Sequence, residues 1–179
     1  MGTIDGEGEW GFLSLGPYAA LFRASIAKKI AFDTDIDLME DTIWNARFLR
    51  EGDSFVILQE TLYLYRMNEY SATHNYSVEI VPKRMRALER LSLEVSPDAQ
   101  RWFALRALAN FYCCCKGIMW SQGGLSTKQR IAQARKMSRH PVWGIYGQAG
   151  IAHGWPIRQI VKRWAALTGI VPFLMIRKG

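Results

Sequence analysis

Two adjacent carboxylates, Glu40 and Asp41, stand at the start of a run of residues with helical spacing and are the strongest candidates for chemistry in the chain. A carboxylate within hydrogen-bond reach of a hydroxyl can remove its proton while the oxygen attacks an electrophile. At a helix N-terminus, free N–H groups and the helix dipole favour the ionised form. As an isolated pair, however, these residues are more typical of a helix N-cap than of a catalytic site.

A second group of polar residues follows an aromatic run further along the chain. Arg66 ends this run, and His74 lies in the polar segment after it. A guanidinium matches phosphate or carboxylate oxygens with two parallel hydrogen bonds, and a neutral imidazole can bind a metal. Arg66 is therefore a candidate anion-binding residue and His74 a candidate metal ligand. The plainer interpretations are a surface arginine and a solvated loop histidine.

The order and spacing of these groups resemble the second half of the catalytic domain of family 2 glycosyltransferases, which have the GT-A fold. The likeness is to bacterial enzymes that build polysaccharide from nucleotide-sugars. In that family a W-x-K-L-[FY]-R helix precedes a phenylalanine followed by E-D-T, then Y-x-Y-R and S-x-T. The corresponding segments here are Tyr18–Arg23, Phe32–Thr42, Tyr63–Arg66 and Ser71–Thr73. The resemblance covers approximately residues 10 to 78.

The resemblance implies transfer of a sugar from a nucleotide-sugar to a saccharide or lipid-linked acceptor, with inversion at the anomeric carbon. It also implies that Asp41 is the base and that Glu40 positions the acceptor or the loop. A divalent metal, Mn or Mg, is expected in the complete enzyme.

Further site residues follow from the same resemblance. Tyr65, Arg66 and Ser71 are expected to contact the substrates, with Arg66 neutralising the diphosphate leaving group or holding the acidic loop. Trp44 is a candidate platform beneath a sugar ring, although a tryptophan on a helix is more often a core residue. His74 lies where some GT-A enzymes supply a metal-binding histidine.

The chain departs from the family pattern in ways that affect function. Tyr18 and Ala20 replace the tryptophan and lysine of the first helix motif. The family's opening βαβ segment, its aspartate pair for the nucleotide base and its metal motif are missing from this sequence. We therefore expect the chain to be incomplete without an N-terminal nucleotide-binding half, whether as a fragment, a truncated product or a subunit completed by another chain.

Two further metal-site patterns are rejected. The alternating aspartates Asp33, Asp35 and Asp37 imitate a calcium loop, but Leu38 stands where the turn glycine belongs. They also contain the D-x-D metal pattern of GT-A enzymes, yet in the family that motif precedes the segment matching Trp10.

The patterning predicts an α/β segment of partial GT-A type, a small sheet with helices, followed by an α-helical C-terminal region, so that helix dominates overall. The boundary divides an acceptor-side segment, residues 1–79, from a basic helical extension, residues 80–179. Apolar or aromatic runs predict strands at 10–15, 55–58 and 62–65. Apolar spacing and caps predict helices at 18–30, 42–51, from 80 onward, 97–120, from 127 onward, and 155–166.

The two signs of charge are segregated along the chain. Residues 1–79 hold 6 Lys/Arg against 13 Asp/Glu, whereas residues 80–179 hold 17 against 3. A basic amphipathic helix bordered by tryptophan, as at Trp155 to Ala166, is typical of helices that lie on anionic membranes. A solvated helix packed on the core is the plainer alternative. Nucleic acid is a disfavoured partner because no helix-turn-helix, ribonucleoprotein or zinc signature accompanies the charge.

A non-catalytic scaffold at the membrane that retains a glycosyltransferase remnant is the alternative function. Cys113, Cys114 and Cys115 are consecutive, which excludes a disulfide framework and a tetrahedral zinc site and favours three small buried residues. The first residues lack the pattern of a secretory signal, and no stretch is apolar enough over a spanning length. The expected location is the cytoplasm, with peripheral attachment at the inner face of the cell membrane.

Overall fold

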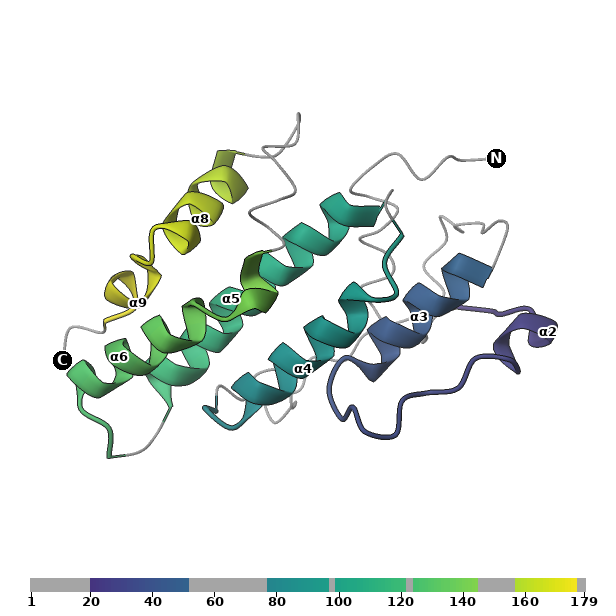
Figure 1. Cartoon of the computed structure of the whole chain (residues 1–179), viewed down its shortest axis with the longest axis horizontal. Helices are drawn as coiled ribbons and strands as arrows, with labels where there is room; N and C mark the ends of the chain where they lie inside the picture. Colours follow the sequence, from purple (N-terminus) through teal and green to yellow (C-terminus); the bar gives the residue numbers. More distant parts are fainter. Residues whose placement is uncertain (1–19, 52–76, 97–98, 122–123, 145–156, 177–179) are drawn as a thin grey trace.

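The computed structural model describes residues 20–51, 77–96, 99–121, 124–144 and 157–176, and these residues form a bundle of helices around α5 (Gln100–Trp120). Figure 1 shows α4 and α3 on one side of α5 and α8 and α9 on the other, and α6 packs along α5. The other elements, in chain order, are α2 (Ala24–Ala27), α3 (Glu40–Glu51), α4 (Ile80–Ser92), α6 (Thr127–Ser138), the 3₁₀ helix η3 (Pro141–Gly144), α8 (Ile157–Leu167) and α9 (Val171–Leu174).

Helix α5 is central because its sequence is apolar around most of its circumference. A helix of that kind must be covered by neighbours on several sides. It contacts α4, α6, η3, α8 and α9. Phe103 and Phe111 are 1% and 0% exposed, and full burial of each such side chain contributes about 1.5–3 kcal/mol.

Residues after α5 close its C-terminal end and start α6. Ser126 and Gln129 form a capping box at the N-terminus of α6, in which each side chain bonds the other residue's backbone. Arg130 then reaches back, and its guanidinium donates to the carbonyl oxygens of Ile118 and Ser121 at 3.0 and 2.7 Å. One arginine thereby satisfies carbonyls that the helix itself leaves without donors.

The main correction concerns the sheet that was predicted in residues 1–79. Helix is the only regular secondary structure among the described residues, without strand or sheet, so the α/β assignment is wrong for this part of the chain. The runs assigned to strands, residues 10–15, 55–58 and 62–65, lie outside the described residues. The apolar residues of α3 and the segment before it are instead buried by packing on other helices.

Most of the predicted helices are present, with corrected bounds. The helix expected over 18–30 is the single turn α2, and the helix expected from Thr42 begins at Glu40. The helices predicted after residue 80 correspond to α4, α5, α6 and α8. One apolar core includes Ile43 of α3 and Leu88 of α4, so it crosses the predicted boundary at residue 79. Within the described ranges, no helix combines the length and hydropathy needed to cross a bilayer.

A glycine in α5 permits the chain before α4 to approach closely. A Cβ at Gly117 would lie 2.9 Å from the carbonyl oxygen of Ser77, a backbone atom that cannot move away as a flexible side chain can. The close approach of Ser77 to α5 therefore depends on the absence of a side chain at Gly117.

We expect Gly117→Ala to lower the free energy of unfolding by about 1–3 kcal/mol, because the added methyl overpacks this contact. Gly144→Ala is the matched control, since a Cβ there meets nothing within 4 Å. Urea unfolding of both variants checks the difference. Equal stability of the two would show that α5 and Ser77 are not in close contact.

Candidate functional site

The two candidate carboxylates lie in the first turn of α3. The first helical hydrogen bond runs from the Ile43 N–H to the Met39 carbonyl oxygen, at 3.1 Å. The carboxylate of Asp41 is half-buried and accepts from the backbone N–H of Thr42 at 2.6 Å and from the Thr42 hydroxyl at 3.2 Å. These bonds fix the orientation of Asp41 at the positive end of the helix dipole.

Met39 precedes these carboxylates in an unusual backbone conformation. Its φ is +65°, and among the described residues it is the one non-glycine in the left-handed region. That conformation costs an L-residue with a Cβ about 1–2 kcal/mol. The side chain is nonetheless 9% exposed and belongs to the core, so burial helps to hold the turn that delivers Glu40 and Asp41.

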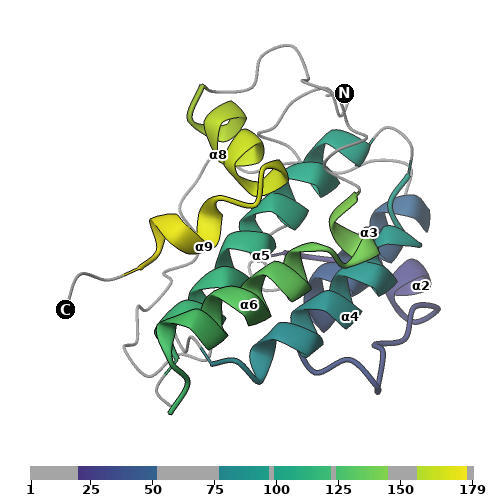
Figure 2. The same cartoon turned by 60° about the vertical axis from the view of Figure 1, so that its left-hand side comes forward.

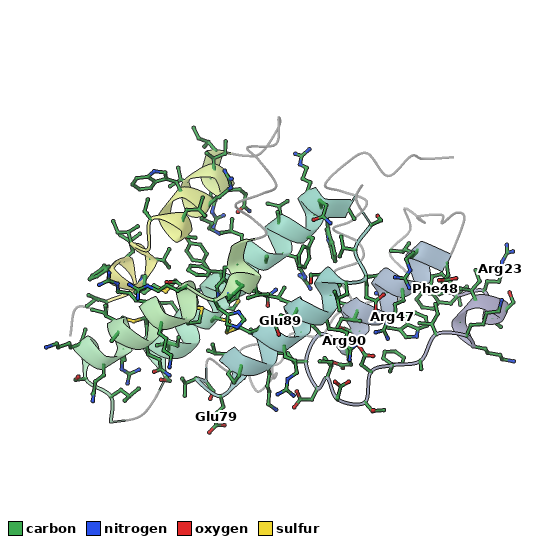
Figure 3. The ribbon with its side chains drawn as sticks, in the orientation of Figure 1. Arg23, Arg47, Phe48, Glu79, Glu89 and Arg90 are labelled. Atoms are coloured by element: carbon green, nitrogen blue, oxygen red, sulfur yellow. The ribbon has the colours of Figure 1, made fainter. Side chains whose placement is uncertain are left out.

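The acidic segment, residues 30–39, is attached to α3 and α4 by ion pairs. Arg47 of α3 bonds Asp33 at 3.0 Å, and Arg90 of α4 lies 3.5 Å from Asp33 and 3.4 Å from Asp35. Figure 3 shows Arg47 and Arg90 where the two helices lie side by side. The aspartates thus join the segment before the candidate carboxylates to both helices.

Arg47 is the centre of this network. Besides Asp33, its guanidinium donates to Glu94 at 2.9 Å and to the Ala31 carbonyl oxygen at 3.2 Å. Burial opposes the charged form, but the hydrogen bonds to Asp33 and Glu94 outweigh it, and the pKa of Arg47 is raised. Glu94 also accepts from Arg50 at 2.8 Å, so both of its oxygens are bound to α3.

Trp44 lies in the core. Its side chain is 5% exposed, is stacked on Phe32 and Phe48, and meets the edge of Phe22. Its indole N–H donates to the carbonyl oxygen of Ile30 at 2.9 Å. The structure therefore fits the core interpretation of Trp44, and such burial leaves no ring face open to a sugar.

The alternating aspartates do not form a metal site. Asp33 and Asp35 are paired with arginines, and Asp37 pairs with Lys83 of α4, whose hydrogen bond lowers the pKa of Asp37. Lysine and arginine side chains thus pair with the carboxylates that a metal ion would need as ligands. Within the described residues, no cluster of three or more His, Cys, Asp or Glu side chains could hold a metal ion.

The remaining candidate residues lie outside the described residues: Tyr65, Arg66, Ser71 and His74. Their assignment to substrate and metal contacts stays a prediction. The structure thus places Glu40 and Asp41 together at the head of α3 and Trp44 in the core behind them.

The cysteine triplet is structural where it is buried. Cys114 and Cys115 are 1% and 0% exposed. Burial raises the pKa of Cys114 to about 12 and that of Cys115 well above its usual range. Both thiols therefore stay protonated at neutral pH, as the interpretation of small buried residues requires.

No protein-family model, curated protein or solved structure matches this chain.

The sequence did not reveal the residues that hold the site in place. Arg47 and Glu94 are 47 positions apart, and Arg47 and Asp33 are 14 apart, so no local pattern connects them. The excess of acid before residue 80 and of base after it favours pairs such as Asp35 with Arg90, but it does not point to Arg47, a cation of the acidic part.

We expect Arg47→Met to lower the free energy of unfolding by about 2–4 kcal/mol, because it leaves Asp33 and Glu94 with less compensation in a largely buried place. Arg50→Met is the control, since its side chain is 48% exposed and such a pair is worth less than about 1 kcal/mol. Thermal and urea unfolding distinguish the two. Equal losses would contradict a central role for Arg47.

We expect Met39→Gly to be more stable than Met39→Ala by about 1 kcal/mol, which reverses the usual order for a residue beside a helix. Both variants delete almost the same buried side chain, so their difference reports the left-handed backbone alone. Unfolding by guanidinium measures it. A more stable alanine variant would exclude a positive φ at this position.

Proposed function

We propose that this chain is the acceptor side of an inverting, family 2-like glycosyltransferase. The observation that supports the proposal most is the placement of Glu40 and Asp41 in the first turn of α3, where the helix dipole favours an anion. The acidic segment that leads into this turn is bonded to α3 and α4. A carboxylate fixed in this way is suited to act as a general base.

The proposed reaction is a single displacement. The Asp41 carboxylate takes the proton of an acceptor hydroxyl while that oxygen forms a bond to the anomeric carbon of the donor sugar. The bond from the anomeric carbon to the phosphate oxygen breaks, and the nucleoside diphosphate leaves with the electron pair. Attack from the opposite face inverts the anomeric configuration. Glu40, adjacent on the chain, orients the acceptor or the turn.

The other proposed contributions come from residues of the sequence motifs. Arg66 would neutralise the diphosphate, with Tyr65 and Ser71 contacting substrate, and His74 is the candidate ligand of the Mn or Mg that such enzymes use. The described part of the chain contains no group of three or more His, Cys, Asp or Glu side chains that could hold this metal. A nucleotide-binding half from further sequence or another chain completes the donor site, and the enzyme works in the cytoplasm at the inner face of the cell membrane.

A non-catalytic scaffold is the second candidate function. The burial of Trp44 favours it, because a residue expected to serve the sugar instead serves the core. In that case the first turn of α3 would retain the glycosyltransferase arrangement of its carboxylates without catalysing sugar transfer.

We expect Asp41→Asn to reduce sugar transfer by about 10²–10⁴-fold, because the amide cannot accept the acceptor's proton. The measurement is transfer from UDP-glucose, UDP-GlcNAc and GDP-mannose with manganese, in membranes of cells that express the gene at its natural locus. Glu51→Gln is the matched control, since Glu51 ends the same helix and its side chain is 56% exposed.

The proposal fails if Asp41→Asn transfers sugar at the rate of the unaltered protein, or if the unaltered protein transfers none of the three sugars. Thermal unfolding of both variants separates a lost base from a lost fold. An Asp41→Asn variant that melts normally and still binds the donor, but does not transfer, is the expected result.

A further inference from the structure

Helix α8 exposes most of its large apolar side chains and buries its small ones, with Ile160 alone of the large ones packed against the core. Ala165 and Ala166 are 4% and 5% exposed. Ile157, Val161 and Trp164 are 81%, 59% and 62% exposed. Their spacing along the helix places these three on one stripe. An amphipathic helix that served the core alone would turn this stripe inward.

Contacts with α5 hold α8 in this orientation. The Tyr112 hydroxyl donates to the carbonyl oxygen of Lys162 at 3.0 Å. The Lys162 ammonium lies 5.6 Å from the centre of the Tyr112 ring, within the range of a cation–π contact. A lysine of α8 therefore faces the bundle while the apolar stripe faces away from it.

The exposed apolar surface continues onto α9. Phe173 and Leu174 are 48% and 67% exposed. Trp164 of α8 and Phe173 of α9 line one groove of about 560 Å³, together with Leu167 and Ile170. Figure 2 shows α8 and α9 together at one side of the bundle. We call this surface the α8–α9 face, made of Ile157, Val161, Trp164, Leu167, Ile170, Phe173 and Leu174.

Cations accompany the α8–α9 face. Arg135 of α6 and Arg139, which follows that helix, line its groove, and both are exposed, as is Arg158 of α8. The sequence from Ala99 to Gly179 contains 13 Lys/Arg and no Asp or Glu. A broad apolar surface within an acid-free, basic region is complementary to one kind of partner, an apolar layer bordered by anions.

We propose that the α8–α9 face docks on an anionic membrane surface. The apolar residues enter the boundary between headgroups and acyl chains, with Trp164 at that level, and the arginines contact the headgroup phosphates. The inference depends on α8, α9 and α6 alone. It therefore stands or falls separately from sugar transfer at α3.

Two other partners fit these observations less well. A second copy docked through the same face would bring the two sets of arginines together, which is unfavourable. Nucleic acid offers phosphates, but its interfaces are polar and would leave Ile157, Val161 and Leu174 without apolar contacts. Both partners are outcomes of the test below.

The test is co-sedimentation of the full chain with vesicles of phosphatidylcholine, with and without about 30% phosphatidylglycerol. We expect binding to the anionic vesicles to be at least about tenfold tighter than to neutral ones, and to weaken in about 0.5 M NaCl because exposed charges are screened. Equal binding to both kinds of vesicle would overturn the proposal.

Paired variants locate the surface. Val161→Ser with Leu174→Ser should weaken binding at least about tenfold, whereas Leu93→Ser, at a residue 74% exposed beyond α4, should not. Arg135→Glu with Arg139→Glu should weaken it at least about tenfold. Lys28→Glu with Lys29→Glu, at two exposed residues away from this face, is the control for the change in net charge.

Circular dichroism melts confirm that each variant is folded before its binding is compared. Loss of binding in the control variants to the same extent would contradict the α8–α9 face as the docking surface. Light scattering and duplex DNA binding are measured in parallel. Dimerisation or DNA binding without vesicle binding would replace the membrane with one of the other partners.

Discussion

The burial of α5 is the constraint on which the rest of the described structure depends. Phe103, Phe111 and Ile118 lie on different turns of this helix, and all are at most 1% exposed. A helix with so little polar surface is stable only when neighbours cover it. Helices α4, α6, α8 and α9 provide that cover.

Ion pairs connect the side of α4 that faces away from α5 to the acidic segment. Helix α4 packs on α5 with its apolar residues and meets the acidic segment with Lys83 and Arg90. Arg47 and Glu94 link α3 to the end of α4. Aspartates of the acidic segment pair with Lys83 and Arg90 of α4, whereas Arg47 and Arg50 of α3 pair in the opposite sense with Glu94 after α4. The head of α3 is positioned by these pairs, so a chemical role for Asp41 would depend on the core through α4.

The sequence predicted the helices better than their surroundings. Helical spacing and the Ser126 capping box located α4, α5, α6 and α8, because these signals are local. The α/β assignment was wrong for the described residues, which hold helices and no strand, and the apolar runs predicted as strands lie outside them. At the site, the pattern located Glu40 and Asp41. It could not show that Trp44 is buried or that Arg47 joins Asp33 to Glu94, because those contacts bring distant residues together. The amphipathic pattern of α8 also did not show which side of that helix faces the core.

Amide hydrogen exchange of the full chain, followed by mass spectrometry, tests the central role of α5 most directly. Exchange in a buried helix requires opening of most of the structure, whereas a peripheral helix opens at lower free energy. We expect the slowest exchange in α5, between Phe103 and Met119, intermediate rates in α3 and α4, and the fastest exchange of these helices in α8. Exchange in α5 as fast as in α8 would contradict that role.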